Sequence, residues 1–369
     1  MTASLRVVIA GGGTGGHLYP GLAVARELLG RHPGHVVTFA GTERGIEARV
    51  LPREGFPLDV IRSAGLKGKS LSAVLRGLTL LPLSFIDAWR IVSSRTPSVV
   101  VGVGGYSSGP VVAVAATRGV PTLLLEQNAA PGLTNRLLAR LVDAAALTYE
   151  DAAPWFRGKG FVTGNPVRQG FNVRSQAEGA AGGRAARRLL VFGGSQGAHA
   201  INVAMAAAAP RFKAHLPALS IVHQTGQADL EMVRAAYQEV GLGARVEPFL
   251  LDMDTEMREA DLVLCRAGAT TLAELAVAGK PAVLVPLPSA TDDHQRKNAE
   301  VLARAGAARL LAQRDLTDET VFALVSGLLA DPTACRAMSE AALRLARPDA
   351  AQRIVDRIVA LAVRKAAER

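Results

Sequence analysis

Gly11 to Leu29 reads GGGTGGHLYPGLAVARELL and directly follows the apolar run Leu5–Ala10. A short apolar run, a glycine cluster and a helical pattern together indicate a strand–turn–helix unit. The glycines at positions 11, 13 and 16 match G-x-G-x-x-G, the fingerprint of a dinucleotide-binding turn. His17 stands where the helix should begin, so the stretch predicts an anion-binding turn with a histidine at its mouth.

Short apolar runs alternate with amphipathic stretches along the chain, which is typical of a parallel sheet covered by helices on both faces. Helices are expected at Gly21–Gly30, Thr134–Leu141 and Ala198–Ala209. The predicted strands are Arg6–Ala10, His35–Ala40, Leu58–Arg62, Ser98–Val103, Thr122–Leu125, Ala144–Thr148, Phe161–Thr163, Leu189–Phe192, Ser220–Gln224, Arg245–Phe249, Asp261–Cys265 and Ala282–Val285.

The strand–glycine–helix opening recurs about half a chain later, where GGSQG occupies residues 193–197. We therefore expect an α/β fold of two doubly wound, Rossmann-like domains that face a cleft, with both glycine turns pointing into it. The predicted bounds are 1–164, 165–345 and, for a C-terminal helix that packs back towards the first domain, 346–369. Arg174–Arg188, RSQAEGAAGGRAARR, reads as a linker and surface loop.

Composition limits the classes of partner. The chain has 369 residues, 49% of them hydrophobic and 4% aromatic, and a net charge of +10, so anionic partners such as phosphorylated substrates or an acidic membrane surface are favoured. Cys265 and Cys335 form no metal spacing and indicate a reducing compartment. The sequence goes straight into the first strand, so we expect no signal segment. Ser98–Thr117 carries no charge, but GGYSSGP interrupts it, so a strand, a turn and a helix explain it better than a membrane span.

Two further stretches carry candidate binding groups. In DLVLCRAGATTLAE, Asp261–Glu274, a strand leads through a small loop into a helix whose amides would face a nucleotide diphosphate. Glu274 follows one helical turn later and could accept both hydroxyls of a ribose, although most helical glutamates are simply exposed. In TDDHQRKN, residues 291–298, Gln295 and Asn298 share a helix face and suit sugar hydroxyls; a polar surface turn is an equally good interpretation.

One acidic pair is a candidate metal site. Asp252 and Asp254 form D-x-D, which can hold a divalent cation against a nucleotide diphosphate, but the pair precedes a helical pattern and capping of that helix is the favoured interpretation. The histidines show no metal-ligand spacing. We therefore expect neither a metal nor a cofactor.

Taken together, the motifs resemble the MurG family of peptidoglycan N-acetylglucosaminyltransferases. GGTGGHLYPGLAVA, GGYSSGP, LEQN with LTN, TGNPVR, GGSQGA, CRAGATTLAEL and DHQRKNA occur in the family's order over nearly the whole chain. The resemblance implies a GT-B fold and an inverting hexosyl transfer from UDP-N-acetylglucosamine to the C4 hydroxyl of the muramoyl sugar of lipid I, giving lipid II. Leu125 stands where relatives often carry histidine, and His294 where some carry glutamine.

The resemblance also implies roles for individual residues. His17 would be the catalytic base, a task that suits an imidazole near neutral pH, or alternatively a ligand of an acceptor phosphate. The implied acceptor-binding residues are Thr14, Gly15, His17, Tyr106, Glu126 and Asn128. The implied residues for UDP-N-acetylglucosamine are Thr14, Gly15, Gly16, Asn128, Arg168, Gly194, Ser195, Gln196, Ala269, Thr270, Glu274, His294, Gln295 and Asn298.

The acceptor's polyprenyl tail stays in the bilayer, so the resemblance implies a peripheral enzyme on the cytoplasmic face of the bacterial inner membrane. Leu66–Val92 is the candidate docking segment. Leu71, Leu75 and Leu78 follow helical spacing, as do Phe85 and Trp89 after Pro82, and Lys67, Lys69 and Arg76 lie beside them. A core-facing helix explains the same periodicity.

Other classes remain as alternatives. A nicotinamide-dependent oxidoreductase would use Gly11–Gly16, but its ribose-binding acid should end the second strand, and Glu43 comes a few residues late. A UDP-sugar epimerase would share the fold and need no lipid acceptor. A nucleic-acid-binding scaffold fits poorly, because aromatic residues are scarce and no compact Lys/Arg run occurs.

Overall fold

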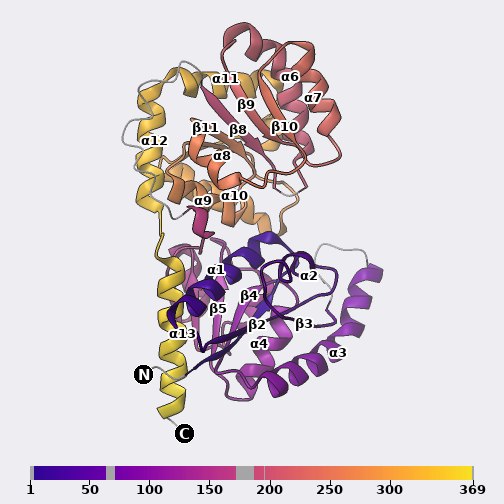
Figure 1. Ribbon diagram of the computed structural model, residues 1–369, viewed down its shortest axis with the longest axis vertical. Helices are drawn as coiled ribbons and strands as arrows, with labels where there is room; N and C mark the ends of the chain where they lie inside the picture. Colours follow the sequence, from indigo (N-terminus) through magenta and orange to yellow (C-terminus); the bar gives the residue numbers. More distant parts are fainter. Residues whose placement is uncertain (1–3, 64–70, 172–186, 195, 368–369) are drawn as a thin grey trace. The chain divides into compact units, whose positions relative to one another are not determined.

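The computed structural model describes residues 4–63, 71–171, 187–194 and 196–367, with the backbone alone at 71–78 and 169. The chain forms two compact units, Met1–Arg168 with Arg347–Arg369, and Gln169–Ala346. Figure 1 follows the chain through both. Lys67, Lys69, Ser195 and most of the predicted linker lie outside the described residues.

The first unit is built on a seven-stranded sheet in the order β3-β2-β1-β4-β5-β6-β7, in which neighbouring strands pair in parallel. Its strands are β1 (Arg6–Gly11), β2 (Val36–Gly41), β3 (Leu58–Val60), β4 (Val99–Gly104), β5 (Thr122–Glu126), β6 (Ala144–Leu147) and β7 (Gly160–Val162). Its helices are α1 (Gly15–Arg31), α2 (Ile46–Val50), α3 (Leu71–Arg95), α4 (Ser108–Thr117), α5 (Leu133–Leu138), α13 (Ala350–Ala367) and the 3₁₀ helix η1 (Glu150–Phe156).

The second unit repeats this plan with a six-stranded parallel sheet in the order β10-β9-β8-β11-β12-β13. Its strands are β8 (Arg188–Phe192), β9 (Ser220–Gln224), β10 (Ala244–Glu247), β11 (Leu262–Cys265), β12 (Ala282–Leu284) and β13 (Ala308–Leu310). Its helices are α6 (His199–His215), α7 (Leu230–Glu239), α8 (Met253–Glu259), α9 (Ala269–Ala278), α10 (His294–Arg304), α11 (Asp318–Ala330) and α12 (Pro332–Leu345), with the 3₁₀ helices η2 (Gln169–Phe171), η3 (Thr291–Asp293) and η4 (Gln313–Asp315).

The two sheets confirm the predicted α/β class and each predicted strand. β13 was not predicted, and α1 begins at Gly15 rather than Gly21. Glycine, histidine and proline are weak helix formers, so the first turns of α1 carry no helical signal. The cleft between the units stays a prediction.

Strand order locates the functional edge of each sheet. In the first unit the order reverses between β1 and β4, and in the second between β8 and β11. Ligands of open parallel sheets bind beyond the carboxyl ends of the strands at such switch points. The predicted glycine turns, which follow β1, β4, β8 and β11, are the loops at these two points.

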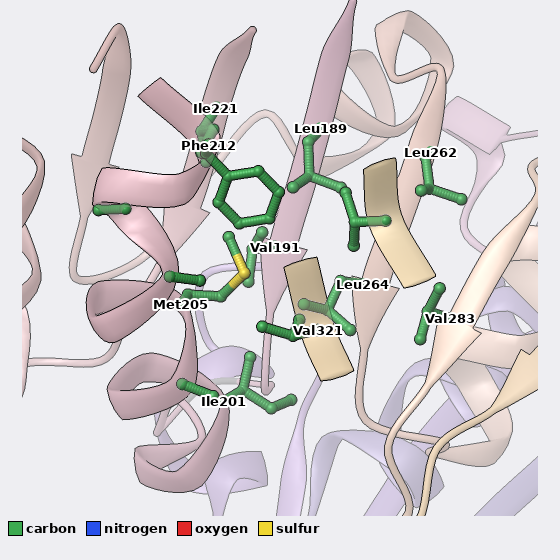
Figure 2. Close-up of a cluster of buried hydrophobic side chains, with 14 of the residues drawn as sticks. Leu189, Val191, Ile201, Met205, Phe212, Ile221, Leu262, Leu264, Val283 and Val321 are labelled. Carbon is green, nitrogen blue, oxygen red and sulfur yellow. The ribbon is translucent and has the colours of Figure 1, made fainter. Parts of the chain in front are cut away.

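Apolar side chains fill both faces of each sheet. Figure 2 shows part of the core of the second unit, where Leu189, Val191 and Leu264 from the sheet meet Met205 and Phe212 of α6. Each fully buried side chain of this size contributes about 1.5–3 kcal/mol through loss of contact with water. The strands that carry the glycine turns are therefore rigid supports.

The last helix belongs to the first unit. Ile354, Val355, Ile358 and Leu361 of α13 are buried in the same cluster as Leu18 and Leu22 of α1, and the two helices run side by side in Figure 1. Arg364 also pairs with Asp143 at 3.1 Å. The predicted long amphipathic C-terminal helix is confirmed.

The uncharged stretch from Ser98 to Thr117 forms β4, a glycine turn and α4, as predicted. No single helix in the described part of the chain is long and apolar enough to cross a membrane. One bent helix pair, Asp318–Ala330 with Pro332–Ala367, meets the criteria of length and composition.

Candidate functional site

The first glycine turn packs backbone to backbone against the second. A Cβ on Gly11 would lie 2.3 Å from the carbonyl oxygen of Gly104, and a Cβ on Gly105 would lie 2.6 Å from that of Gly12. Gly11, Gly12 and Gly13 also have φ values of +141°, +148° and +84°. Only glycine satisfies both conditions, so the two turns form one continuous surface at the switch point of the first sheet.

His17 lies on this surface, in the first turn of α1. A Cβ on Gly104 would come within 2.9 Å of both Nδ1 and Cε1 of His17, so the imidazole lies against the second turn. The histidine is half-buried, and Tyr106 in the second turn is 48% exposed. Thr14 is exposed and Gly15 and Gly16 are half-buried beside them. The predicted acceptor residues from these two motifs are thus neighbours.

Sequence reasoning missed a carboxylate beneath the first turn. Glu47 of α2 is fully buried, and its Oε2 accepts the N–H of Gly13 at 2.7 Å. Its Oε1 accepts the N–H and the hydroxyl of Thr42, both at 2.8 Å. From the sequence, Glu47 reads as an ordinary helical glutamate, and only the pairing of β1 with β2 brings its helix to the turn.

Glu126, at the end of β5, organises its own loop. Its carboxylate accepts hydrogen bonds from the N–H of Asn128 at 2.9 Å, the N–H of Gly132 at 3.1 Å and the side-chain amide of Asn135 at 2.8 Å. Glu126 is 2% exposed, and burial raises its pKa. Its four donors, including the side chain of Asn128 at 3.2 Å, make it a fixed support for that loop. Contact of Glu126 with an acceptor stays a prediction.

Arg168 is the last residue of the first unit. Its guanidinium lies over the ring of Tyr19, 5.2 Å from the ring centre, which is the geometry of a cation–π contact. Tyr19 is in α1, one turn from the glycines, so Arg168 adds positive charge near the start of that helix.

In the second unit, the turn after β8 is held by its neighbours in the same way. A Cβ on Gly197 would lie 1.8 Å from the carbonyl oxygen of Thr225, so glycine is required there. Gln224 donates to the carbonyl of Gly194 at 2.6 Å and accepts the N–H of Leu250 at 2.9 Å. This side chain, which sequence reasoning missed, ties the turn to the loop after β10. Gly194 and Gln196 are exposed.

The loop after β11 leads into α9, whose N-cap is Gly268. Ala269 and Thr270 form the first turn, as predicted, and Glu274 lies one turn further on. Glu274 is 4% exposed, unlike most helical glutamates, and its charge contributes to the raised pKa of the buried thiol of Cys265. The burial of this carboxylate distinguishes it from an ordinary surface glutamate.

Arg266, in the same loop, is 9% exposed, and burial lowers its pKa. It donates to the carbonyls of Val285 and Pro286 at 3.1 and 3.2 Å and to Oε1 of Gln313 at 2.7 Å. These bonds hold its guanidinium at the carboxyl ends of β11 and β12.

The predicted polar pair on α10 is confirmed as part of one helix, with Asn298 fully buried and Gln295 half-buried. Oε1 of Gln295 accepts the N–H of Leu287 at 3.0 Å. His294 begins the helix, and its Nδ1 lies 2.6 Å from the carbonyl oxygen of Thr291. Asp293 occupies the N-cap position but makes no side-chain cap, because its backbone is left-handed with φ +55°.

The acidic pair in D-x-D is held by arginines. Asp252 lies 3.1 Å from Arg245, whose guanidinium lowers the pKa of that carboxyl, and Asp254 lies 3.3 Å from Arg258. Asp252 occupies the N-cap of α8 without making a side-chain cap. The side-chain cap that the sequence predicted is absent, because the Asp252 carboxylate pairs with Arg245 instead. Among the residues that the structure describes, no cluster of His, Cys, Asp and Glu could hold a metal ion.

Comparison with known proteins gives the class. The N-terminal domain of glycosyltransferase family 28 matches residues 7–147, and the C-terminal domain of the same family matches residues 188–354. With two doubly wound units and glycine turns at both switch points, the chain has the GT-B fold of nucleotide-sugar glycosyltransferases.

Relatives over the full length narrow this class. The UDP-N-acetylglucosamine–N-acetylmuramyl-(pentapeptide) pyrophosphoryl-undecaprenol N-acetylglucosamine transferase of Pelobacter propionicus is 47% identical, over 96% of this chain and 99% of its own. The transferase of the same name from Myxococcus xanthus is 46% identical, over 97% and 94%. The crystal structure of Acinetobacter baumannii MurG has a TM-score of 0.76 and 34% identity, and the match covers 95% of this chain and 98% of that one. The chain belongs to glycosyltransferase family 28 and, within it, to the MurG family.

Proposed function

We propose that this chain transfers N-acetylglucosamine from UDP-N-acetylglucosamine to the C4 hydroxyl of the muramoyl sugar in undecaprenyl-diphospho-muramoylpentapeptide, lipid I, and so makes lipid II for peptidoglycan. The observation that carries this proposal is the 47% identity to a transferase of that name over nearly the whole of both chains. The acceptor oxygen attacks C1 of the donor sugar, the bond from C1 to the UDP oxygen breaks, and the configuration at C1 inverts.

The second unit binds the donor. Glu274 accepts hydrogen bonds from the ribose hydroxyls, and the turns at Gly194–Gln196 and Ala269–Thr270 take the diphosphate on backbone amides. Gln295 and Asn298 bind the hexose. The position of Glu274, one helical turn after Ala269 and Thr270 on α9, and the place of Asn298 and Gln295 on one helix support these roles. Arg266 and the N-terminus of α9 stabilise the negative charge that develops on the departing UDP.

The first unit binds the acceptor, and His17 removes the proton from the attacking hydroxyl. Inversion in one displacement requires one base, and an imidazole is suited to that task near neutral pH. The position of the ring against Gly104, beside the exposed Tyr106, supports this role. Glu126 keeps the loop that carries Asn128 in place for the acceptor.

The protein acts at the surface of an anionic membrane, on the cytoplasmic face of the bacterial inner membrane. The support comes from α3, which has two faces. Ala88, Ile91 and Val92 are buried against the sheet, whereas Phe85, Ile86 and Trp89 are 44%, 45% and 55% exposed. The guanidinium of Arg118 lies 4.5 Å from the centre of the Trp89 ring, and Arg90 is exposed beside it. We call Phe85, Ile86, Trp89, Arg90 and Arg118 the α3 patch; an apolar face with basic neighbours suits interfacial attachment.

The direct test of the reaction is incubation of the purified chain with UDP-N-acetylglucosamine and a soluble short-chain lipid I analogue. Mass analysis should find the acceptor heavier by one N-acetylhexosamine, with equimolar UDP. Consumption of the UDP-sugar without modification of the acceptor would contradict the proposal and favour an epimerase or a hydrolase.

A further inference from the structure

The buried carboxylate of Glu47 has an unusual set of partners. Two of its three hydrogen bonds come from backbone N–H groups, those of Gly13 and Thr42, and the third comes from the Thr42 hydroxyl. Gly13 lies in the turn that follows β1, and Thr42 in the loop that follows β2. The carboxylate therefore joins the carboxyl ends of two neighbouring strands.

Three glycines make room for this carboxylate. A Cβ on Gly12 would lie 2.5 Å from Cδ of Glu47, a Cβ on Gly41 would lie 2.7 Å from its Cγ, and a Cβ on Gly45 would lie 2.2 Å from its Cδ and both oxygens. Side chains at these positions would overlap with Glu47. The glycines of this region thus leave space for the buried Glu47 carboxylate and also permit the backbone conformation of the turn.

The same position has another use in dinucleotide-binding folds. There the glycines let the backbone approach a pyrophosphate, which accepts hydrogen bonds from the amides of the turn. In this chain a carboxylate already accepts the N–H of Gly13 from the protein side. A phosphate at Gly12–Gly13 would compete for that donor and would meet a like charge that is fully buried.

We propose that Glu47 is the resident anion of the first glycine turn, which excludes phosphate from Gly12–Gly13 and fixes the turn on which His17 is mounted. The first consequence, exclusion of phosphate, does not depend on the proposed function. The second consequence rests on the proposed function: Glu47 acts as a positioning residue for the acceptor side of the transfer, so that an acceptor diphosphate binds elsewhere than at these two glycines.

The test compares three variants of the full chain with the wild type. Glu47→Ala removes the anion and opens its space, Glu47→Gln removes the charge but keeps the volume, and Glu43→Ala is the matched control. Glu43 is an exposed glutamate four residues earlier in the same connection. Inorganic pyrophosphate binding is measured by titration calorimetry with UDP present throughout, which keeps a donor site filled.

We expect Glu47→Ala to bind pyrophosphate about tenfold more tightly than the wild type. Glu47→Gln loses the like charge but still fills the space beside Gly13, so its affinity should lie between those of the wild type and Glu47→Ala, whereas Glu43→Ala should bind pyrophosphate as the wild type does. Formate should also raise the thermal midpoint of Glu47→Ala selectively, because it replaces the missing carboxylate, whereas the neutral isostere formamide should not. Equal pyrophosphate affinity in wild type and Glu47→Ala, or equal effects of formate and formamide, would overturn the proposal. Neither readout depends on transferase activity, so failure here is distinguishable from failure of the proposed function.

Kinetics test the positioning role and remain available if Glu47→Ala does not fold. In Glu47→Gln the NH2 group of the side-chain amide cannot accept the hydrogen bonds that Thr42 donates. The loop after β2 is then no longer joined to the first glycine turn as it is in the wild type. We expect kcat to fall at least tenfold while the affinity for UDP, whose proposed site is in the other unit, stays unchanged. Formate should restore turnover in Glu47→Ala but not in Glu47→Gln, whose side chain fills the space. Wild-type kcat in Glu47→Gln, or an equal change in both parameters, would overturn the positioning role.

Discussion

The imidazole of His17 lies against the backbone of Gly104, such that a Cβ on Gly104 would approach Nδ1 and Cε1 to 2.9 Å. This relationship joins the first glycine turn to the second, and the sequence separation of the two residues hides it from any local pattern. One side of the imidazole ring therefore packs on Gly104, whose φ is +93°. This packing holds the proposed base in place for proton transfer.

Removal of the imidazole should therefore affect turnover more than donor affinity. We expect His17→Ala to lower kcat by about 10²–10⁴, the usual contribution of general base catalysis. UDP affinity should be unchanged, because the proposed nucleotide site is in the other unit. His17→Gln keeps a hydrogen-bonding group but no base, and it should be as slow as His17→Ala. If His17→Gln instead turns over at nearly the wild-type rate, His17 binds acceptor phosphate and is not the base.

A substitution that displaces the His17 ring tests the same role of His17 in a second way. Gly104→Ala should displace the imidazole, and a shift of about 1 Å at a reacting group can lower a rate by about 10². Gly30→Ala is the matched control, because its Cβ would have no neighbour within 4 Å. Circular dichroism and thermal midpoints show whether each variant is folded. Equal rates in the two folded variants would contradict the placement of the base.

Glu274 should determine donor recognition. Charge-assisted hydrogen bonds to ribose hydroxyls are worth about 1.5–3 kcal/mol, so Glu274→Ala should lower kcat/KM for the UDP-sugar by about one to two orders of magnitude. Glu239→Ala, at an exposed glutamate that ends α7 in the same unit, should have no effect. Unchanged kinetics in a folded Glu274→Ala protein would exclude this glutamate from the donor site.

Membrane attachment should depend on the α3 patch and on salt. Each basic residue near an anionic surface contributes about 1 kcal/mol, and salt screens this attraction. Cosedimentation with phosphatidylserine-containing liposomes should therefore be strong at low salt and fall as salt rises. Phe85→Ser with Trp89→Ser should weaken it, as should Lys67, Lys69 and Arg76 replaced by Glu. Activity on a soluble short-chain acceptor should persist in both variants.

Val363→Ser is the control for the apolar replacements, because Val363 is 60% exposed on α13 of the same unit. It should sediment as the wild type does. Intact liposome binding in both the Phe85/Trp89 variant and the Lys67/Lys69/Arg76 variant would mean that the protein docks through another surface.

The stability of the second unit should fall in mild acid because of His223. This histidine is fully buried between Tyr237 and Asn202, and burial lowers its pKa to about 3. Histidine in an unfolded chain titrates near 6.5. Between these values the unfolded state binds a proton that the native state does not, so stability is lost as pH falls below about 6.5, by up to about 1.4 kcal/mol per pH unit.

His223→Gln removes this titration. Its urea midpoint should be lower than that of the wild type at pH 7, but it should fall less steeply between pH 7 and pH 5. Parallel pH dependences in the two proteins would show that His223 does not take part in acid sensitivity.

The sheet could be predicted from the sequence because its strands are buried on both faces and read as continuous apolar runs. β13 escaped prediction, since Ala308–Leu310 lies within an alanine-rich stretch that reads as helix. The glycine turns could be predicted because segments of backbone that approach closely require glycine, and the resulting glycine clusters are visible in the sequence. Glu47, Gln224 and the burial of Glu274 left none, because their partners lie on other strands and only tertiary packing identifies them.

The stereochemistry of the product tests the central claim most directly. The wild-type chain, incubated with UDP-N-acetylglucosamine and the lipid I analogue, should give a disaccharide whose new linkage is β and joins C1 of N-acetylglucosamine to C4 of the muramoyl sugar. Proton NMR of the purified product reports both features. The coupling constant of the new anomeric proton distinguishes a β from an α linkage, and a nuclear Overhauser contact from that proton to H4 of the muramoyl sugar identifies the linked position. An α linkage, attachment to another hydroxyl, or free 2-epimerised sugar in place of a disaccharide would contradict the account.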